Sequence, residues 1–140
     1  MQRIAQREKD LAQEKGTMNL GKSLLPVMDI LPLAIKSVNS EHLTPLPESD
    51  ARYEDRKNLI TLHEGLVLLQ SNLTKALKEN DIESVDPTGE KFNPDNHEAL
   101  YQAPIPGKEP GSVLECSKLG YSYKGRTLRA AQVGVVQDTS

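Results

Sequence analysis

The chain has 140 residues, of which 36% are hydrophobic, with no tryptophan, one phenylalanine and four tyrosines, so any core must be mostly aliphatic. This length suits one ordinary domain or two small ones, and the shortage of aromatic side chains favours small units that associate over one large core. The formal charge of −3, with basic and acidic residues mixed along the chain, argues against a nucleic-acid partner, and the single Cys116 excludes an intrachain disulfide.

The first ten residues contain Arg3 and Arg7 but also Glu8 and Asp10, and no serine. Transit peptides are rich in arginine and poor in acids, and signal peptides have an apolar central stretch. We therefore expect no leader of either kind in this chain. No apolar run approaches the length that spans a bilayer, so we expect no membrane segment either.

Residues 1 to about 40 are predicted to form an amphipathic helix. Apolar residues recur first every seven positions and then at alternating steps of four and three, which lines one helix face: Ile4, Leu11, Met18 and Leu25, then Leu20, Leu24, Val27, Leu31, Ala34 and Val38. Gly16 and Gly21 each weaken this helix by about 1 kcal/mol, and Pro26 and Pro32 each by about 3 kcal/mol. We therefore expect the helix to depend on packing partners.

A second helix is predicted from about residue 51 to 80, after a loop that contains Pro45 and Pro47. Its leucines alternate steps of three and four, which is a heptad seam: Leu59, Leu62, Leu66, Leu69, Leu73 and Ala76. Two amphipathic helices joined by such a loop predict an antiparallel hairpin. Because a lone hairpin leaves its apolar stripes half exposed, we expect two copies to form a four-helix bundle.

From Asp86 onward proline and glycine are frequent and the helical period is lost. Strands are predicted at residues 113–116, 121–123, 126–128 and 131–136, with a tight turn at Lys124 and Gly125 between the second and the third. The sequence thus predicts an α+β protein, with a helical dimerisation region at residues 1–82 and a small β-domain at residues 83–140.

No credible active site emerges from the remaining polar residues. His97 and Glu98 have no second histidine nearby, and Cys116 lacks a partner histidine, so structural roles are favoured for all three. We expect no enzyme activity, no cofactor and no metal. Arg126 and Arg129 lie three positions apart on a strand, which sends their side chains to opposite faces. Either one of them faces a partner or both are simply solvated.

Several ordered motifs resemble those of the GrpE family, most closely its mitochondrial, fungal-type members. The segments that carry this resemblance are residues 24–29, 64–66, 92–99, 109–113, 120–121 and 125–133. The family is dimeric, with a paired N-terminal stalk helix, a four-helix bundle and one β-domain per protomer. About twenty residues precede Leu24, so we expect most of the stalk to be missing here.

The resemblance implies a co-chaperone that promotes ADP release from the nucleotide-binding domain of a DnaK-type ATPase chaperone, supporting protein folding and protein import in the mitochondrial matrix. It implies chaperone contacts at Arg126, Pro110, Gly111, Val113 and Val135. The implied dimer interface consists of Leu24, Val27, Met28, Leu31, Leu59, Leu62, Leu66, Leu69 and Leu73. The structural motif residues are Phe92, Pro94, His97, Glu98, Gly120, Gly125 and Arg129. A dimeric scaffold whose β-domain binds another protein without sensing nucleotide is the main alternative, ahead of an enzyme.

Overall fold

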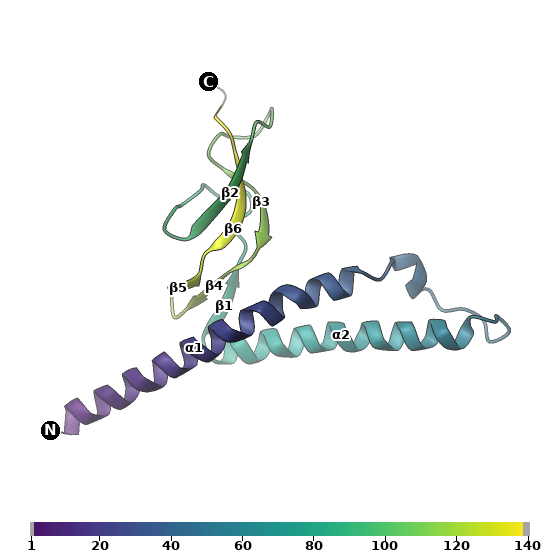
Figure 1. Cartoon of the computed structure of the whole chain (residues 1–140), viewed down its shortest axis with the longest axis horizontal. Coiled ribbons are helices and arrows are strands. Elements are labelled where there is room, and N and C mark those ends of the chain that lie inside the picture. Colours follow the sequence, from purple (N-terminus) through teal and green to yellow (C-terminus); the bar gives the residue numbers. More distant parts are fainter. Residues whose placement is uncertain (1, 139–140) are drawn as a thin grey trace. The chain divides into compact units, whose positions relative to one another are not determined.

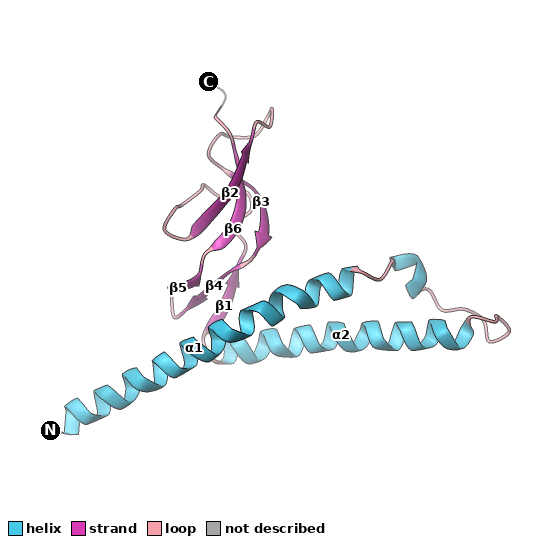
Figure 2. Cartoon of the chain, in the orientation of Figure 1, coloured by secondary structure: helices cyan, strands magenta, loops and turns pink. Residues whose placement is uncertain are grey.

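The computed structural model describes residues 2–138, in which helices precede short strands (Figures 1 and 2). The helical elements are α1 (Gln2–Lys36), the short 3-10 helix η1 (Ser40–Leu43) and α2 (Tyr53–Glu79). The strands are β1 (Ile82–Val85), β2 (His97–Ala103), β3 (Val113–Lys118), β4 (Gly120–Tyr123), β5 (Arg126–Arg129) and β6 (Ala131–Val136). The predicted α+β class is confirmed, whereas the pairing of two copies stays a prediction.

Two compact units make up the chain. One is the helical hairpin from Leu24 to Ala76, and the other joins the residues up to Ser23 with those from Leu77 onward. The sequence predicts a domain boundary between residues 82 and 83, and that boundary stays a prediction. In the compact units, the first part of α1 belongs with the strands.

α1 runs through Pro26 and Pro32 without interruption. It also contains one 18-residue window, 22% of it buried, that is long and apolar enough by composition to cross a membrane. This corrects the expectation that no apolar run approaches such a length. Mostly buried core helices and signal sequences near an N-terminus pass the same test, so length and composition alone do not assign a membrane segment here.

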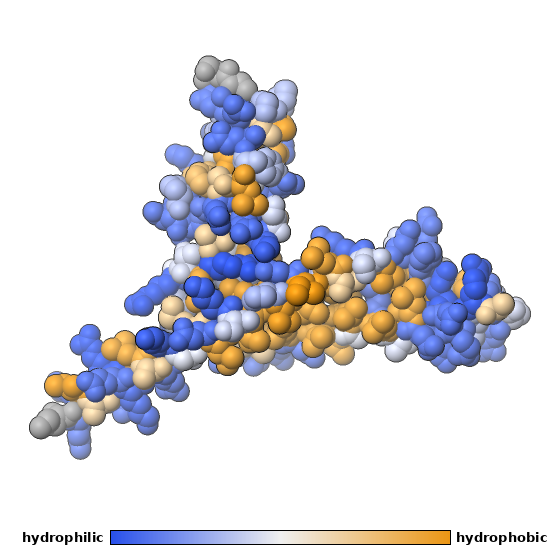
Figure 3. Space-filling model, in the orientation of Figure 1, coloured by the Kyte–Doolittle hydropathy of each residue, from blue (hydrophilic) through white to orange (hydrophobic). Residues whose placement is uncertain are grey.

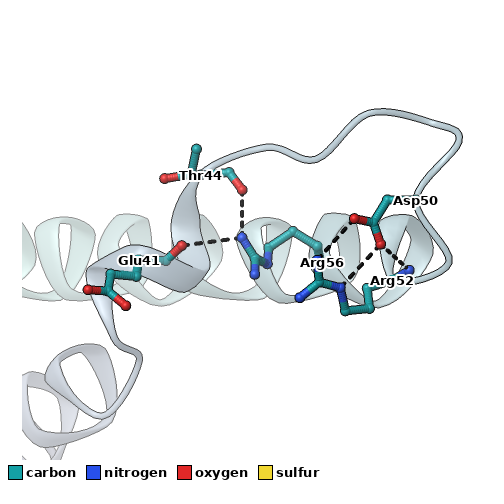
Figure 4. A network of polar contacts seen from close by, with 5 residues as sticks. All are labelled: Glu41, Thr44, Asp50, Arg52 and Arg56. Carbon is teal, nitrogen blue, oxygen red and sulfur yellow. Dashed lines mark hydrogen bonds and ion pairs between the residues drawn. The ribbon is translucent and has the colours of Figure 1, made fainter.

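The loop between η1 and α2 is fastened by Arg56 of α2 and by Arg52, which lies just before that helix (Figure 4). Arg56 Nη1 donates to the carbonyl oxygens of Glu41, at 3.3 Å, and Thr44, at 2.8 Å. Asp50 accepts a hydrogen bond from the backbone nitrogen of Arg52 at 2.8 Å and pairs with its guanidinium at 3.0 Å. These hydrogen bonds from Arg52 lower the pKa of Asp50 to about 2.

The strands form two three-stranded sheets. One has the order β1-β4-β5 and is antiparallel, and the other has the order β2-β6-β3, with β2 parallel and β3 antiparallel to β6. The main core of the strands lies on the second sheet, where the half-buried Phe92 and Cys116 pack against buried aliphatic side chains, namely Val113, Ala131, Val133 and Val135. β1 and β2 were not predicted, and only Ile82 and His97 are buried in them, so neither shows the alternation of a half-buried strand.

Gly134 in β6 allows the ring of Tyr101 in β2 to lie across the central strand. An ideal Cβ at residue 134 would overlap the Tyr101 phenol ring, and the Tyr101 hydroxyl donates a hydrogen bond to Glu115 in β3. Tyr101 thus joins β2 to β3 over the glycine. This bond to a carboxylate raises the pKa of Tyr101.

Gly21 has a similar packing role on α1. An ideal Cβ there would overlap Cδ1 of Ile82 and lie 3.9 Å from Cδ2 of Leu128, and both of these side chains are buried. The hairpin turn of β4 and β5 is held to the same helix by Lys124, whose Nζ lies 3.3 Å from Glu14 Oε1. The sequence marked Gly21 only as a weak point in a helix, whereas the structure shows the close approach that requires it.

Candidate functional site

The turn between β4 and β5 presents Arg126 at the start of β5. Lys124 and Gly125 both have positive φ, 48° and 83°, which is typical of a two-residue type I′ hairpin turn. Tyr123 and Arg126 pair across this turn, so the predicted tight turn is confirmed. Apart from the adjacent residues, nothing in the described part of the chain lies within 4 Å of an ideal Cβ at Gly125, so it is the backbone conformation and not crowding that favours glycine there.

The two arginines of β5 have different surroundings, as their odd spacing predicts. Arg126 is exposed, and no hydrogen bond or ion pair holds its guanidinium among residues 2–138. Arg129 is half-buried, donates from Nη2 to the Leu119 carbonyl oxygen at 2.6 Å, and has its guanidinium carbon 5.3 Å from the centre of the Tyr121 ring. Arg126 is therefore the arginine of the pair that is available to a partner.

A second group of expected contact residues lies in the loop before β3. Gly111 has φ of 84°; its nitrogen donates to the Val136 carbonyl at 2.9 Å, and its own carbonyl accepts from the Phe92 nitrogen at 2.9 Å. Pro110 beside it is exposed. The loop is thus fastened through its backbone, which leaves the exposed Pro110 side chain at the surface.

Val113 and Val135 do not fit the role of surface contacts. They pair with each other across β3 and β6, and their exposed fractions are only 2% and 6%. Their side chains belong to the core, because this face of the sheet is covered by other residues of the chain. The expectation that Val113 and Val135 touch a partner is corrected. Both residues instead pack in the core on β3 and β6.

The two surface groups are not brought together into one pocket. Arg126 begins β5, which precedes β6, and Gly111 is bonded to the last residue of β6, Val136. A six-residue strand such as β6 extends for about 17 Å, at about 3.3 Å per residue. A partner that contacts both groups must therefore reach the two ends of the segment formed by β5 and β6.

The motif from Phe92 to His97 forms a compact turn. The Asn93 carbonyl accepts from the nitrogens of Asn96, at 3.1 Å, and His97, at 2.8 Å, while the Asn93 side chain accepts from the Asp95 nitrogen at 3.0 Å. His97 is buried; its Nδ1 accepts from the Asn93 nitrogen at 2.9 Å, and its ring lies 5.8 Å from that of Phe92. The motif histidine therefore has a structural partner, and the motif residues Pro94 and Glu98 are exposed.

Gly120 is a strand residue and not a turn residue. Its ideal Cβ would lie 3.0 Å from the Ala131 nitrogen and 3.2 Å from the Arg129 carbonyl oxygen. Backbone atoms cannot move aside as a side chain can. The resemblance names Gly120 as a structural motif residue, and the structure shows a close approach there of β4 to the corner between β5 and β6.

The expected dimer residues divide into three groups in the helical hairpin. Met28 and Leu31 are buried within the chain itself, which leaves little of either side chain for a second copy, and their part in the interface stays a prediction. Half-buried positions are Leu24, Leu59, Leu66 and Leu73, and exposed ones are Val27, Leu62 and Leu69. The predicted heptad seam of α2 therefore divides into two rows of leucines, each with a spacing of seven residues. Leu59, Leu66 and Leu73 form the half-buried row, and Leu62 and Leu69 form the exposed row.

Sequence reasoning missed further exposed apolar residues on both helices. They are Ile30 and Leu33 in α1, at 62% and 68% exposure, and Val67 and Leu68 in α2, at 42% and 61%. Figure 3 shows hydrophobic side chains gathered along the hairpin. The spacing of three from Val27 through Ile30 to Leu33 is the signal that would have identified the α1 part of this surface.

Comparison with known proteins gives a consistent result. The family model described as GrpE matches residues 1–137. The mouse protein named GrpE protein homolog 1, mitochondrial, is 40% identical over 96% of this chain and 59% of its own length. The proteins named GrpE protein homolog, mitochondrial, from Neurospora crassa and Schizosaccharomyces pombe are 35% and 36% identical, and each is matched over 56% of its length. The chain thus spans less than two thirds of each of these relatives.

Proposed function

Because this chain belongs to the GrpE family, we propose that it is an adenine-nucleotide exchange factor. It acts as a co-chaperone that binds the nucleotide-binding domain of a DnaK-type ATPase chaperone and accelerates ADP release. It makes and breaks no covalent bond itself. The observation that carries this proposal is the family match along residues 1–137, with both helices and all six strands of the described chain inside it.

Exchange without catalysis requires only differential binding. The factor must bind the open, nucleotide-poor conformation of the chaperone more tightly than the closed one. By linkage, ADP then weakens the binding of the factor to the same extent as the factor weakens the binding of ADP. A tenfold difference in affinity corresponds to about 1.4 kcal/mol, so a large acceleration needs several well-placed contacts.

Arg126 is our principal candidate for such a contact. Its guanidinium is exposed at the start of β5, next to a hairpin turn that Lys124 holds against α1. A guanidinium binds a carboxylate through two parallel charge-assisted hydrogen bonds, so an acidic side chain of the chaperone is the matching partner. Pro110 and Gly111, at the far end of β6, supply a second contact region.

The exposed apolar surface of the helical hairpin supports a homodimer. Leu62 and Leu69 lie seven residues apart on α2 with exposed fractions of 62% and 52%, and Ile30 and Leu33 expose still more of α1. Contiguous apolar surface of this kind marks an interface. A second copy would cover it in a four-helix bundle. Replacing Leu69 by glutamate should therefore yield a monomer in sedimentation velocity, and an unchanged dimer would contradict this interface.

We place the protein in the mitochondrial matrix, where it supports folding and import of proteins by its chaperone. The support is the word mitochondrial in the names of the mammalian, fungal and nematode relatives. Partners that are nucleic acids or membranes are not part of this proposal. The negative net charge is unfavourable for binding to phosphate backbones.

Stopped-flow release of fluorescently labelled ADP from a mitochondrial DnaK-type chaperone tests the proposal. Wild-type protein should accelerate release, and Arg126→Ala should lose much of the acceleration while remaining dimeric. Arg52→Ala, which removes an exposed arginine from the helical unit, serves as the matched control and should behave as wild type. If the protein binds the chaperone equally well with and without ADP, the scaffold alternative is favoured and the exchange function is refuted.

A further inference from the structure

Asn96 connects the motif turn to both sides of the corner between β5 and β6. Its side-chain Oδ1 accepts a hydrogen bond from Thr127 Oγ1 at 2.7 Å, and its carbonyl oxygen accepts from the Ala131 nitrogen at 3.1 Å. Thr127 is the neighbour of Arg126 in β5, and Ala131 begins β6. One residue of the motif thus holds the strand that carries the exposed arginine.

Asn96 is itself held in place by the turn. Its nitrogen donates to the Asn93 carbonyl, as does that of His97, and the buried His97 ring accepts from the Asn93 nitrogen. Because these bonds tie Asn96 into the turn, a shift of the strand away from the turn would lengthen or break its bond to Thr127. The polar residues of the motif therefore have a structural role: they hold the Asn96 side chain, which accepts the hydrogen bond from Thr127.

The side of β5 that faces the motif turn borders a cleft of about 290 Å3, lined among others by Asn96, His97, Thr127 and Arg129. Leu128, whose side chain points to the other face, is buried. At this cleft, the Thr127–Asn96 hydrogen bond links the motif turn directly to the residue next to Arg126.

We propose that Asn96 and Thr127 are positioning residues, which hold the backbone at Arg126 so that less of the strand has to be ordered when the partner carboxylate binds the guanidinium. Pre-organisation of this kind strengthens binding by reducing the ordering that binding requires. The inference rests on the proposed function and adds Asn96 and Thr127 to the residues that contribute to it. Both side chains are exposed, so the bond competes with water, and its loss should weaken the chaperone interaction by about two- to tenfold.

The test compares Thr127→Val with Thr127→Ser in the full chain. Valine keeps the shape of threonine without the donor, whereas serine keeps the donor. At factor concentrations below saturation, Thr127→Val should lower the acceleration of ADP release by about two- to tenfold, and Thr127→Ser should keep it. Asn96→Ala should match Thr127→Val. In an Arg126→Ala background, Thr127→Val should have little further effect, because the group that it positions is gone.

The outcomes separate this inference from the proposed function. If Thr127→Val has the same effect with and without Arg126, the hydrogen bond supports only the fold, and the positioning role is overturned although exchange activity stands. If wild-type protein fails to accelerate ADP release, both are overturned. Amide hydrogen exchange of β5 provides a second readout: faster exchange at Arg126 in Thr127→Val supports the inference, and unchanged exchange opposes it.

Discussion

Replacing Gly21 by alanine should fail to give the stabilisation that the same change gives at Gly16. Both glycines lie inside α1, and an alanine in a helix interior is better than a glycine by about 1 kcal/mol. Nothing lies within 4 Å of an ideal Cβ at Gly16, so the full gain is expected there. At Gly21 the new methyl group would overlap Cδ1 of Ile82.

The magnitude follows from the packing of Ile82. Its Cδ1 must move to restore the usual separation of about 3.5–4.0 Å between carbon atoms, but the side chain is only 2% exposed. Overpacking of a filled core costs about 1–3 kcal/mol. After the gain in helix propensity, Gly21→Ala should therefore be destabilising by about 0–2 kcal/mol.

Urea unfolding followed by far-UV circular dichroism measures these differences, with all variants at one protein concentration because self-association adds stability. Ile82→Val, which removes Cδ1, should bring the effect of Gly21→Ala close to that of Gly16→Ala, although the valine itself costs about 0.5–1.5 kcal/mol. If Gly21→Ala stabilises the wild-type background as much as Gly16→Ala does, the contact with Ile82 has been misread.

Three further outcomes are expected. Gly134→Ala should destabilise the protein by about 1–3 kcal/mol in urea unfolding, because the Cβ of the new alanine would overlap the Tyr101 ring. This loss of stability should be smaller in a Tyr101→Ala background. An equal loss in that background would contradict the overlap. The Asp50 carboxyl should titrate near pH 2 by NMR, and a midpoint near 3.8 would exclude its pairing with Arg52. The contribution of this pairing to stability should be complete above about pH 4 and be lost as the pH falls towards 2. This pH dependence should be absent in Arg52→Ala. Burial raises the pKa of the Cys116 thiol, so alkylation at neutral pH should be slower in the folded protein than in urea, and equal rates would show an exposed thiol.

The helices could be predicted from the sequence because their signal is local. The spacing of Leu59, Leu66 and Leu73 depends only on the helical repeat, so α2 was predicted almost to its ends. The same leucines could not show which row faces the neighbouring helix and which is exposed, since that depends on where α1 lies. Gly21 appeared to be a defect for the same reason: Ile82, which requires it, is 61 positions away in the sequence.

The candidate site could be predicted in part. A repeat of two predicts that Arg126 and Arg129 lie on opposite faces whatever the sheet, and the structure gives the two side chains different exposure. The exposure of Val113 and Val135 depends on which face of the sheet is covered, and the expectation for them was wrong. β2 escaped prediction because, apart from His97 at its start, it has no buried side chain to create a pattern.

The two surface groups lie at opposite ends of one continuous stretch of chain. Arg126 begins β5, and the Pro110–Gly111 loop is bonded to the last residue of β6. A partner that bound a single point would be free to rotate about it. A partner that bound both groups would be held in one orientation on the β-domain.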